Sequence, residues 1–319
     1  MGKTNQKSSF YELDPEVVLK ATELAGFLPT GEFTQLNSYE NRVFDIRLED
    51  PKLSRVIAKF YRPGRWSKDC ILEEHQFLDE LRSEGLTAIN PLVQKNKSTL
   101  NTVHGMHVAF FPKVQGRMPE EFLKNDLKQV GRKLALLHNV GAQKDFEHRP
   151  YLGILPDSMW DHLDLLQEKV VPELWSRYEK AATEILIRFE DLVDPNEFLR
   201  IHGDCHRGNI LSNGQDFFFV DFDDCMMGPA AQDFWMLFSS SDSKEEEEEI
   251  ISGYEELREF PDHQLGWIPL LRGLRIISYA AWIARRWEDP SFPRLFPDFS
   301  TYTYWAEETE ALEKIAWST

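Results

Sequence analysis

Three cysteines in a chain of 319 residues are too few for a disulfide framework, and Cys70, Cys205 and Cys225 form no C-x-x-C pair. The cysteines therefore favour a reducing compartment. The sequence also lacks the roughly 18 uninterrupted apolar residues that a membrane span requires, and its polar first nine residues contain no apolar signal segment. These absences predict a cytoplasmic protein with no membrane partner.

Positive charge is scarce as well. The sequence has 36 Lys and Arg residues against 54 Asp and Glu residues, which gives a formal net charge of −18. A field of this sign repels nucleic acid, so nucleic-acid binding is disfavoured. ATP is also an anion, so a nucleotide site must supply its own cations: a metal ion, a lysine or backbone N–H groups. With 42% hydrophobic and 13% aromatic residues, the chain can form the core of one large domain or two lobes.

The strongest chemical signal is a stretch that is predicted to form a short β-hairpin. Its apolar segments, Ile210–Leu211 and Phe217–Val220, flank a run of turn-forming residues. Asn209 enters this hairpin and Asp221 leaves it. Because antiparallel pairing brings the outer ends of a hairpin together, an amide oxygen is expected beside a carboxylate. That pair suits Mg²⁺, which fills its remaining positions with water and phosphate.

Asp204 lies five residues before Asn209, in a loop whose glycines allow tight turns. A carboxylate held there could orient a hydroxyl and accept its proton while the metal neutralises the phosphates, which is the division of labour that phosphoryl transfer needs. The alternative is a hydrolase-type metal cluster formed by His202, Asp204 and His206. This alternative is weaker because no further His-rich segment supplies a second set of ligands.

The spacing Asp-x-x-x-x-Asn, followed by Asp-Phe-Asp, resembles the catalytic loop and the metal-binding Asp-Phe-Gly of protein kinases. The fuller form His-Gly-Asp-x-His-x-x-Asn is similar to the aminoglycoside phosphotransferase and choline kinase branch of that superfamily. The resemblance implies an α+β, two-lobed kinase-like fold with ATP between the lobes. Residues 1–111 would form an antiparallel β-sheet lobe with one helix, and residues 112–319 a mostly helical catalytic lobe. In this fold Asp204 and Asp221 would be catalytic, and Asn209 and Asp221 would hold Mg²⁺.

Residue patterns predict the elements of both lobes. Runs with strand character form an antiparallel meander and then complete a sheet of about five strands: Glu32–Leu36, Arg42–Leu48, Arg55–Phe60, Asn90–Val93, Ser98–Val103 and Met106–Phe111. Apolar periodicity and capping residues predict helices at Pro15–Leu24, Trp66–Arg82, Met118–Val140, Asp161–Leu192 with a break at Pro172, and Leu265–Trp287.

The resemblance implies phosphate-binding roles for two residues of the first lobe. The loop at 37–41 contains no G-x-G-x-x-G, but this branch often carries Ser or Asn there, which places Ser38 on a phosphate. The segment Val-Ile-Ala-Lys that ends at Lys59 resembles the Val-Ala-Ile-Lys strand of kinases. Lys59 is therefore expected to bind the α- and β-phosphates, although a lone lysine between apolar residues is more often one that reaches the surface.

A carboxylate partner for Lys59 is expected on the following helix. Glu74 falls on the apolar stripe of this helix, whereas Glu73 points about 100° away. A carboxylate on a core-facing stripe needs a cationic partner, and Lys59 is the natural candidate. The alternative is that Glu74 lies at the wet edge of the stripe, so that Glu73, or neither glutamate, makes the pair.

Three further features have expected roles. Phe110–Lys113 is predicted to be the hinge between the lobes, and by the resemblance its backbone would contact the adenine edge. Asp233 would brace the catalytic loop, again by resemblance. His138 is expected to be a core or interface histidine and not a catalytic one.

The acceptor of the phosphate is less well determined. An aminoglycoside or choline acceptor would need an acidic cleft, and the chain is acidic enough to supply one. The segments after residue 281 instead resemble a bacterial stress-response branch of serine/threonine protein kinases with the small-molecule phosphotransferase fold. This implies transfer to Ser or Thr of proteins, autophosphorylation included. The alternatives are a small-molecule alcohol kinase of the sugar, choline, homoserine or aminoglycoside type, and a silent nucleotide-binding regulator, which the intact Asp204, Asn209 and Asp221 disfavour. Nothing in the sequence demands a partner subunit, so a monomer is expected.

Overall fold

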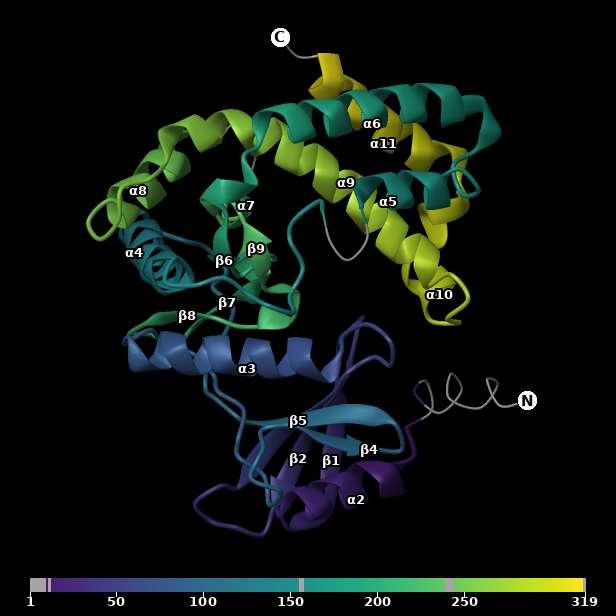
Figure 1. The fold of residues 1–319 in the computed structure, drawn as a ribbon. Helices are drawn as coiled ribbons and strands as arrows, with labels where there is room; N and C mark the ends of the chain where they lie inside the picture. The colour runs from purple at the N-terminus through teal and green to yellow at the C-terminus, as the bar shows by residue number, and fades with distance from the viewer. Residues whose placement is uncertain (1–9, 11–12, 155–157, 239–243, 318–319) are drawn as a thin grey trace.

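The computed structural model describes residues 10, 13–154, 158–238 and 244–317, and it has two lobes (Figure 1). The smaller lobe is built on a five-stranded antiparallel sheet with the order β1-β2-β3-β5-β4. Its strands are β1 Pro29–Leu36, β2 Arg42–Leu48, β3 Arg55–Phe60, β4 Asn101–Val103 and β5 Met106–Pro112.

Helix α2 (Pro15–Ala25) covers one face of this sheet. It begins at Asp14, whose side chain accepts a hydrogen bond from the N–H of Glu16 (2.9 Å), and it ends at Gly26, which adopts the left-handed conformation (φ 99°). Its buried residues Val18 and Ala21 pack in one cluster with alternate residues of the sheet, so the helix closes the core of the small lobe.

Helix α3 (Lys68–Ser83) lies between the two lobes (Figure 1). Ile71 packs with Tyr61 and Ala109 of the sheet lobe, whereas Phe77 and Leu81 belong to the large core of the helical lobe. The helix therefore has apolar contacts in both lobes. For this reason the predicted division of the chain between residues 111 and 112 stays a prediction, although the chain does leave the sheet at Pro112, inside the predicted hinge.

The second lobe is mostly helical. Its helices are α4 Lys124–Gly141, α5 Met159–Leu166, α6 Pro172–Leu192, α7 Ala230–Trp235, α8 Lys244–Tyr254, α9 Ile268–Arg285, α10 Phe292–Leu295 and α11 Tyr302–Trp317. Two short strand pairs, β6 Leu199–Ile201 with β9 Met226–Gly228 and β7 Ile210–Ser212 with β8 Phe217–Phe219, lie on the side facing α3. Short 3₁₀ segments occur at Pro195–Glu197, Arg207–Asn209, Phe222–Asp224, Asp262–Trp267 and Pro297–Ser300. Among the helices of the described ranges, none has the length and apolar character that crossing a bilayer would take.

Most predicted elements are confirmed, including the break at Pro172, which is the first residue of α6. The strand predicted at Asn90–Val93 is wrong. Pro91 has no N–H to donate, and the segment touches the sheet through the N–H of Leu92, which donates to the carbonyl of Phe110 (2.6 Å). The helix predicted from Met118 begins instead at Lys124. Arg117 pairs with Ser212 of the hairpin in an extended conformation, and Pro119 disfavours a helical Met118.

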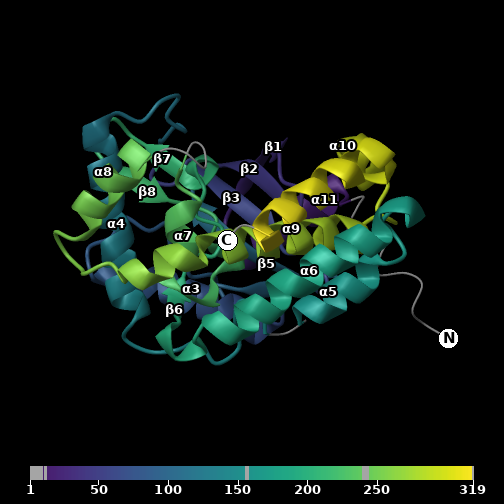
Figure 2. The same ribbon diagram turned by 90° about the horizontal axis from the view of Figure 1, so that it is seen from above.

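Helices α4 and α8 cross at unusually close range, side by side in both views (Figures 1 and 2). A Cβ atom on Gly131 of α4 would lie 2.1 Å from the carbonyl oxygen of Ile250, and one on Gly253 of α8 would lie 2.0 Å from that of Lys128. Both obstacles are backbone atoms, which cannot rotate away. The two glycines therefore let the helices pack backbone to backbone.

We expect Gly131→Ala and Gly253→Ala each to destabilise the protein by about 1–3 kcal/mol, because the added methyl group forces the helices apart. Chemical denaturation followed by circular dichroism measures the change. Gly266→Ala is the matched control, since a Cβ there meets nothing within 4 Å. Equal stability of the control and the two helix variants would contradict the close crossing.

Candidate active site

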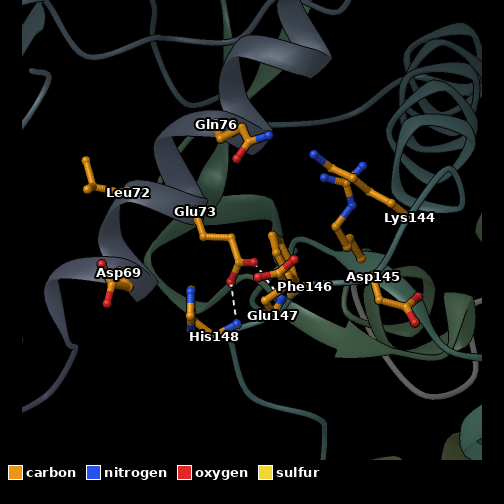
Figure 3. Close-up of a pocket in the computed structure, with 10 residues that line it drawn as sticks. Asp69, Leu72, Glu73, Gln76, Lys144, Asp145, Phe146, Glu147 and His148 are labelled. Carbon is orange, nitrogen blue, oxygen red and sulfur yellow. Dashed lines mark hydrogen bonds between the residues drawn. The ribbon is translucent and has the colours of Figure 1, made fainter.

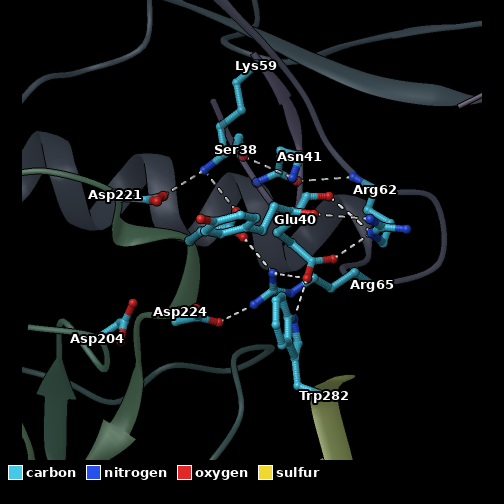
Figure 4. Close-up of polar contacts among 12 residues, drawn as sticks. Ser38, Glu40, Asn41, Lys59, Arg62, Arg65, Asp204, Asp221, Asp224 and Trp282 are labelled. Carbon is cyan, nitrogen blue, oxygen red and sulfur yellow. Dashed lines mark hydrogen bonds and ion pairs between the residues drawn. The ribbon is translucent and has the colours of Figure 1, made fainter. Parts of the chain in front are cut away.

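The open end of the β7–β8 hairpin holds two of the predicted metal ligands. Ile210 pairs with Phe219, and the N–H of Val220 donates to the carbonyl of Asn209 (2.9 Å), so Asn209 and Asp221 lie at the same end of the hairpin. Asp221 adopts the left-handed conformation (φ 64°, ψ 63°), which is uncommon for a residue with a side chain. The conformation leaves its carboxylate 60% exposed toward the cleft, where Figure 4 shows it near Lys59.

Asp204 lies in the loop before the hairpin and is held from two sides. The side-chain Nδ2 of Asn209 donates to the carbonyl of Asp204 (2.9 Å) and approaches its carboxylate (3.4 Å), while Arg275 of α9 pairs with the other carboxylate oxygen (2.7 Å). Burial raises the pKa of Asp204, but His206 and Arg275 outweigh it and hold the pKa well below its usual value. The group is therefore an ionised carboxylate at neutral pH, able to accept a hydrogen bond from a hydroxyl.

Asp233 of α7 braces this loop. Its carboxylate accepts hydrogen bonds from the N–H of His202 (2.7 Å) and of Gly203 (2.8 Å). His138 of α4 also bonds Asp233 (3.3 Å) through Nε2, and its Nδ1 bonds the hydroxyl of Tyr254 (2.9 Å). The predicted bracing role of Asp233 and the buried, structural position of His138 are both confirmed.

The alternative metal cluster at His202, Asp204 and His206 does not form. His202 is buried beneath the loop, where its Nε2 donates to the carbonyl of Val220 (2.9 Å) and its Nδ1 accepts from the N–H of Asp204 (3.3 Å). Both ring nitrogens are thus occupied. Across the described ranges, no group of three or more His, Cys, Asp or Glu residues is arranged to hold a metal ion.

Lys59 of β3 is buried in a cluster of carboxylates. Its Nζ lies 2.9 Å from Asp223, 3.5 Å from Asp221 and 3.8 Å from Glu74. Burial lowers the pKa of Lys59, but Asp223 and Glu74 outweigh it and raise the pKa well above its ordinary value. Lys59 is therefore a permanent cation, and it joins the sheet lobe to the loop that follows the hairpin.

The structure distinguishes the two candidate glutamates of α3. Glu74 is 2% exposed and faces Lys59, and Arg149 pairs with its other oxygen at 2.8 Å. Glu73 points elsewhere: its carboxylate accepts the backbone N–H groups of Glu147 (2.6 Å), His148 (2.9 Å) and Arg149 (2.9 Å). Glu73 lines a separate cavity of about 320 Å³, where it points toward Glu147 and His148 (Figure 3). Glu73 thus holds the 147–149 segment against α3 and leaves Glu74 as the partner of Lys59.

The loop at 37–41 brings Ser38 close to Lys59 and Glu40 close to Arg62 and Arg65 (Figure 4). The hydroxyl of Ser38 accepts the N–H of Asn41 (3.2 Å) and shapes the turn. Glu40 then ties the loop to both lobes. It pairs with Arg62 (2.9 Å) and Arg65 (3.0 Å) of the sheet lobe, and from α9 it accepts the indole N–H of Trp282 (2.7 Å) and pairs with Arg286 (2.7 Å).

Comparison with known proteins identifies the group to which this site belongs. The model of the phosphotransferase enzyme family matches residues 32–266. The chain belongs to this family. It is 39% identical over 306 residues to "Serine/threonine protein kinase RdoA" of Salmonella typhimurium, covering 94% of this chain and 92% of that one. It is 37% identical over 317 residues to "Stress response kinase A" of Escherichia coli, covering 96% of this chain and 93% of that one.

Solved structures show that the phosphotransferase has the fold of small-molecule kinases. The amicoumacin kinase hAmiN, solved with AMP-PNP, Ca²⁺ and Ami, superposes with a TM-score of 0.77 at 19% identity, covering 98% of this chain and 96% of that one. A microcompartment-associated aminopropanol kinase gives 0.73 at 20% identity, covering 95% and 96%. The family and the curated relatives establish that the phosphotransferase is a kinase enzyme, with the predicted two-lobed α+β fold.

Sequence reasoning missed two charged residues of the phosphotransferase that complete the cluster at Lys59. Asp223 is the last residue of the Asp-Phe-Asp motif, so its position in the motif could have identified it. Arg149 lies in an irregular segment with no periodic pattern, so nothing local marked it. Its side chain is fully buried, pairs with Glu74 and donates to the carbonyl of Asp223 (2.8 Å).

We expect Arg149→Met to destabilise the phosphotransferase by about 3–5 kcal/mol, because it leaves the buried carboxylate of Glu74 with a weaker set of partners. In the double variant Arg149→Met/Glu74→Leu, the loss should be smaller than the sum of the two single losses. Thermal and urea denaturation measure both. Arg177→Met, which breaks the exposed pair with Glu313 (2.6 Å), should cost less than about 1 kcal/mol. Additive single losses would show that Arg149 and Glu74 do not act as a pair.

Proposed function

We propose that the chain transfers the γ-phosphate of ATP, with Mg²⁺, to Ser and Thr hydroxyls of proteins, its own included, in a bacterial stress response. The observation that best supports this proposal is the contact between the two lobes at Lys59 and Asp221. Lys59 of the sheet lobe lies 3.5 Å from Asp221, and Asp221 leaves the hairpin that Asn209 enters. Lys59, the pair Asn209 and Asp221, and the carboxylate of Asp204 thus lie near one another, which supports a phosphate-binding, a metal-binding and an acceptor-orienting role for them.

Asn209 and Asp221 fit a hard divalent cation. Because the Nδ2 of Asn209 donates to the carbonyl of Asp204, the amide oxygen remains an acceptor, and the carboxylate of Asp221 is exposed. One amide oxygen and one carboxylate are the few protein ligands that Mg²⁺ takes beside phosphate and water. When bound, the ion neutralises charge on the phosphates. Lys59, braced by Glu74, adds a second cation there, and Ser38 covers the phosphates.

Asp204 acts on the acceptor. Its carboxylate accepts a hydrogen bond from the acceptor hydroxyl and so orients the oxygen toward the γ-phosphorus. The acceptor oxygen forms a bond to that phosphorus while the bond to the bridging oxygen of ADP breaks, and the hydroxyl proton passes to Asp204 and on to solvent. The products are ADP and a phosphomonoester.

The name of the Salmonella relative, "Serine/threonine protein kinase RdoA", supports a protein acceptor, and the name of the Escherichia coli relative, "Stress response kinase A", supports the stress role. Each match spans more than nine-tenths of both chains. The second candidate is a small-molecule alcohol kinase, which the solved neighbours favour because their printed names specify small molecules. Those neighbours are at most 20% identical to this chain. Their acceptors are therefore weaker evidence for the acceptor of this chain than the names of the curated relatives are. We further propose that the enzyme acts in the cytoplasm as a monomer.

We expect Asp204→Ala to lower transfer by roughly 10²–10⁴-fold while nucleotide affinity stays nearly unchanged, because Asp204 acts on the acceptor. Asp221→Ala should lower transfer and also weaken binding of Mg·ATP. Incubation with γ-labelled ATP, alone and with a generic protein substrate, measures transfer, and calorimetry measures nucleotide affinity.

The matched control is Asp50→Ala, which removes an exposed carboxylate in the β2–β3 turn. Label on Ser or Thr that disappears in Asp204→Ala supports the protein kinase. ATP consumption that requires an added small alcohol moves the proposal to the second candidate. Nucleotide binding with no transfer to any acceptor would instead support a silent regulator.

A further inference from the structure

A second cavity, of about 170 Å³, lies directly beside the catalytic loop. Gly203, next to Asp204 in the chain, forms part of its lining, and so does Arg275 of α9. Helix α5 and the segment before it form the opposite side. Much of the lining is apolar, with Met159, Leu271 and Leu274 among its residues. The cavity is large enough for one amino-acid side chain, and a group in it would lie beside a hydroxyl bound at Asp204.

The charge of this cavity has the opposite sign to that of the chain. Among the described residues that line it there is no Asp or Glu, and Arg275 supplies its one permanent charge. The guanidinium of Arg275 is 36% exposed and lies 2.7 Å from Asp204, so it occupies one oxygen of the nearest carboxylate. A net charge of −18 therefore does not make this part of the cleft acidic.

A cationic acceptor meets two obstacles here. An ammonium group that enters the cavity finds no carboxylate among the described residues that line it, so its loss of hydration is not compensated. It also meets the like charge of Arg275 within a few ångströms, where solvent screens the repulsion only in part. An uncharged hydroxyl with an apolar neighbour meets neither obstacle. Its hydroxyl can bond the second oxygen of Asp204, and its neighbour can pack against the leucines of α9.

We propose that Arg275 is a specificity-determining residue, which admits hydroxyl acceptors with an apolar group beside the hydroxyl and rejects those with a cationic group there. A Ser or Thr within a polypeptide, next to an apolar side chain, meets this requirement because its own nitrogen is an uncharged amide. Amine-bearing alcohols do not. The inference rests on the proposed transfer reaction and specifies the chemistry of its acceptor.

The experiment compares two matched pairs of acceptors with γ-labelled ATP and Mg²⁺. The first pair is two peptides identical except for Leu or Lys next to a single Ser. The second pair is glycerol and 1-amino-2-propanol. Transfer is measured as kcat/KM for the parent protein, Arg275→Ala, Arg275→Lys and the control Arg285→Ala, which removes an exposed arginine from the same helix.

We expect the parent to prefer the uncharged member of at least one pair by 10-fold or more. Arg275→Ala should reduce this preference to less than about 3-fold, even where total activity falls, whereas Arg275→Lys and Arg285→Ala should keep it. Loss of activity from misplacement of Asp204 alone would lower both members of a pair equally, so the ratio isolates the effect of charge.

An unchanged ratio in Arg275→Ala, or a parent that prefers the cationic members, would overturn the inference. Transfer to neither uncharged acceptor would also overturn it, even if the protein labels itself, because the cavity would then not be an acceptor site. Transfer to glycerol but to no peptide would leave the inference standing and remove the protein-kinase proposal. The two proposals can therefore fail separately.

Discussion

The two lobes are joined at a buried cluster of opposite charges, and the geometry of the cleft depends on it. Lys59 of β3 lies within 4 Å of Asp223, Asp221 and Glu74, and Arg149 pairs with Glu74 from the helical lobe. Asp221 is exposed, but the other side chains are buried. Because buried charges are costly unless they are paired, Lys59, Asp223, Glu74 and Arg149 hold one another in place. Strand β3, helix α3 and the loop after the hairpin are thereby held together. That is the arrangement that the proposed phosphate-binding role of Lys59 and the proposed metal-binding role of Asp221 need.

Around this cluster the helical lobe supplies a rigid support for the catalytic loop. Asp233 accepts two consecutive backbone N–H groups of the loop and is itself buried against His138. Because α4 also crosses α8 through paired glycines, the position of His138 follows from close helix packing. The position of Asp204 is thus fixed by the core of the lobe and not by the loop itself. A functional residue on a loop can be held precisely when the loop is anchored to a rigid core in this way.

Helix α9 connects Asp204 to the 37–41 loop. Near its middle Arg275 pairs with Asp204, and toward its end Trp282 and Arg286 hold Glu40 of the 37–41 loop. One helix therefore contacts both the residue proposed to act on the acceptor and the loop proposed to cover the phosphates. It also reverses the local charge: the sequence as a whole is strongly acidic, yet the cavity beside Asp204 carries the charge of an arginine. An acidic composition was compatible with an amine-binding cleft, but composition does not say where each charge lies.

The sequence by itself determined the family, the order of the elements, and the residues of the hairpin and catalytic loop. These features depend on short-range patterns: alternating apolar residues, turn-forming runs and the spacing from Asp204 through Asn209 to Asp221. Its errors at Asn90–Val93 and before Lys124 arose where a strand or a helix was predicted across a proline, Pro91 or Pro119, that works against the predicted element. Helical periodicity already favoured Glu74 over Glu73 as the partner of Lys59, and the tertiary structure decided between them: Glu74 lies 3.8 Å from Lys59, whereas Glu73 accepts the backbone N–H groups of the 147–149 segment. Tertiary structure alone decided the places of Arg149 and Arg275, because each pairs with a carboxylate about 70 residues away in the chain, at Glu74 and Asp204. No local pattern encodes such a pair, because the attraction between the two charges depends on their distance in space.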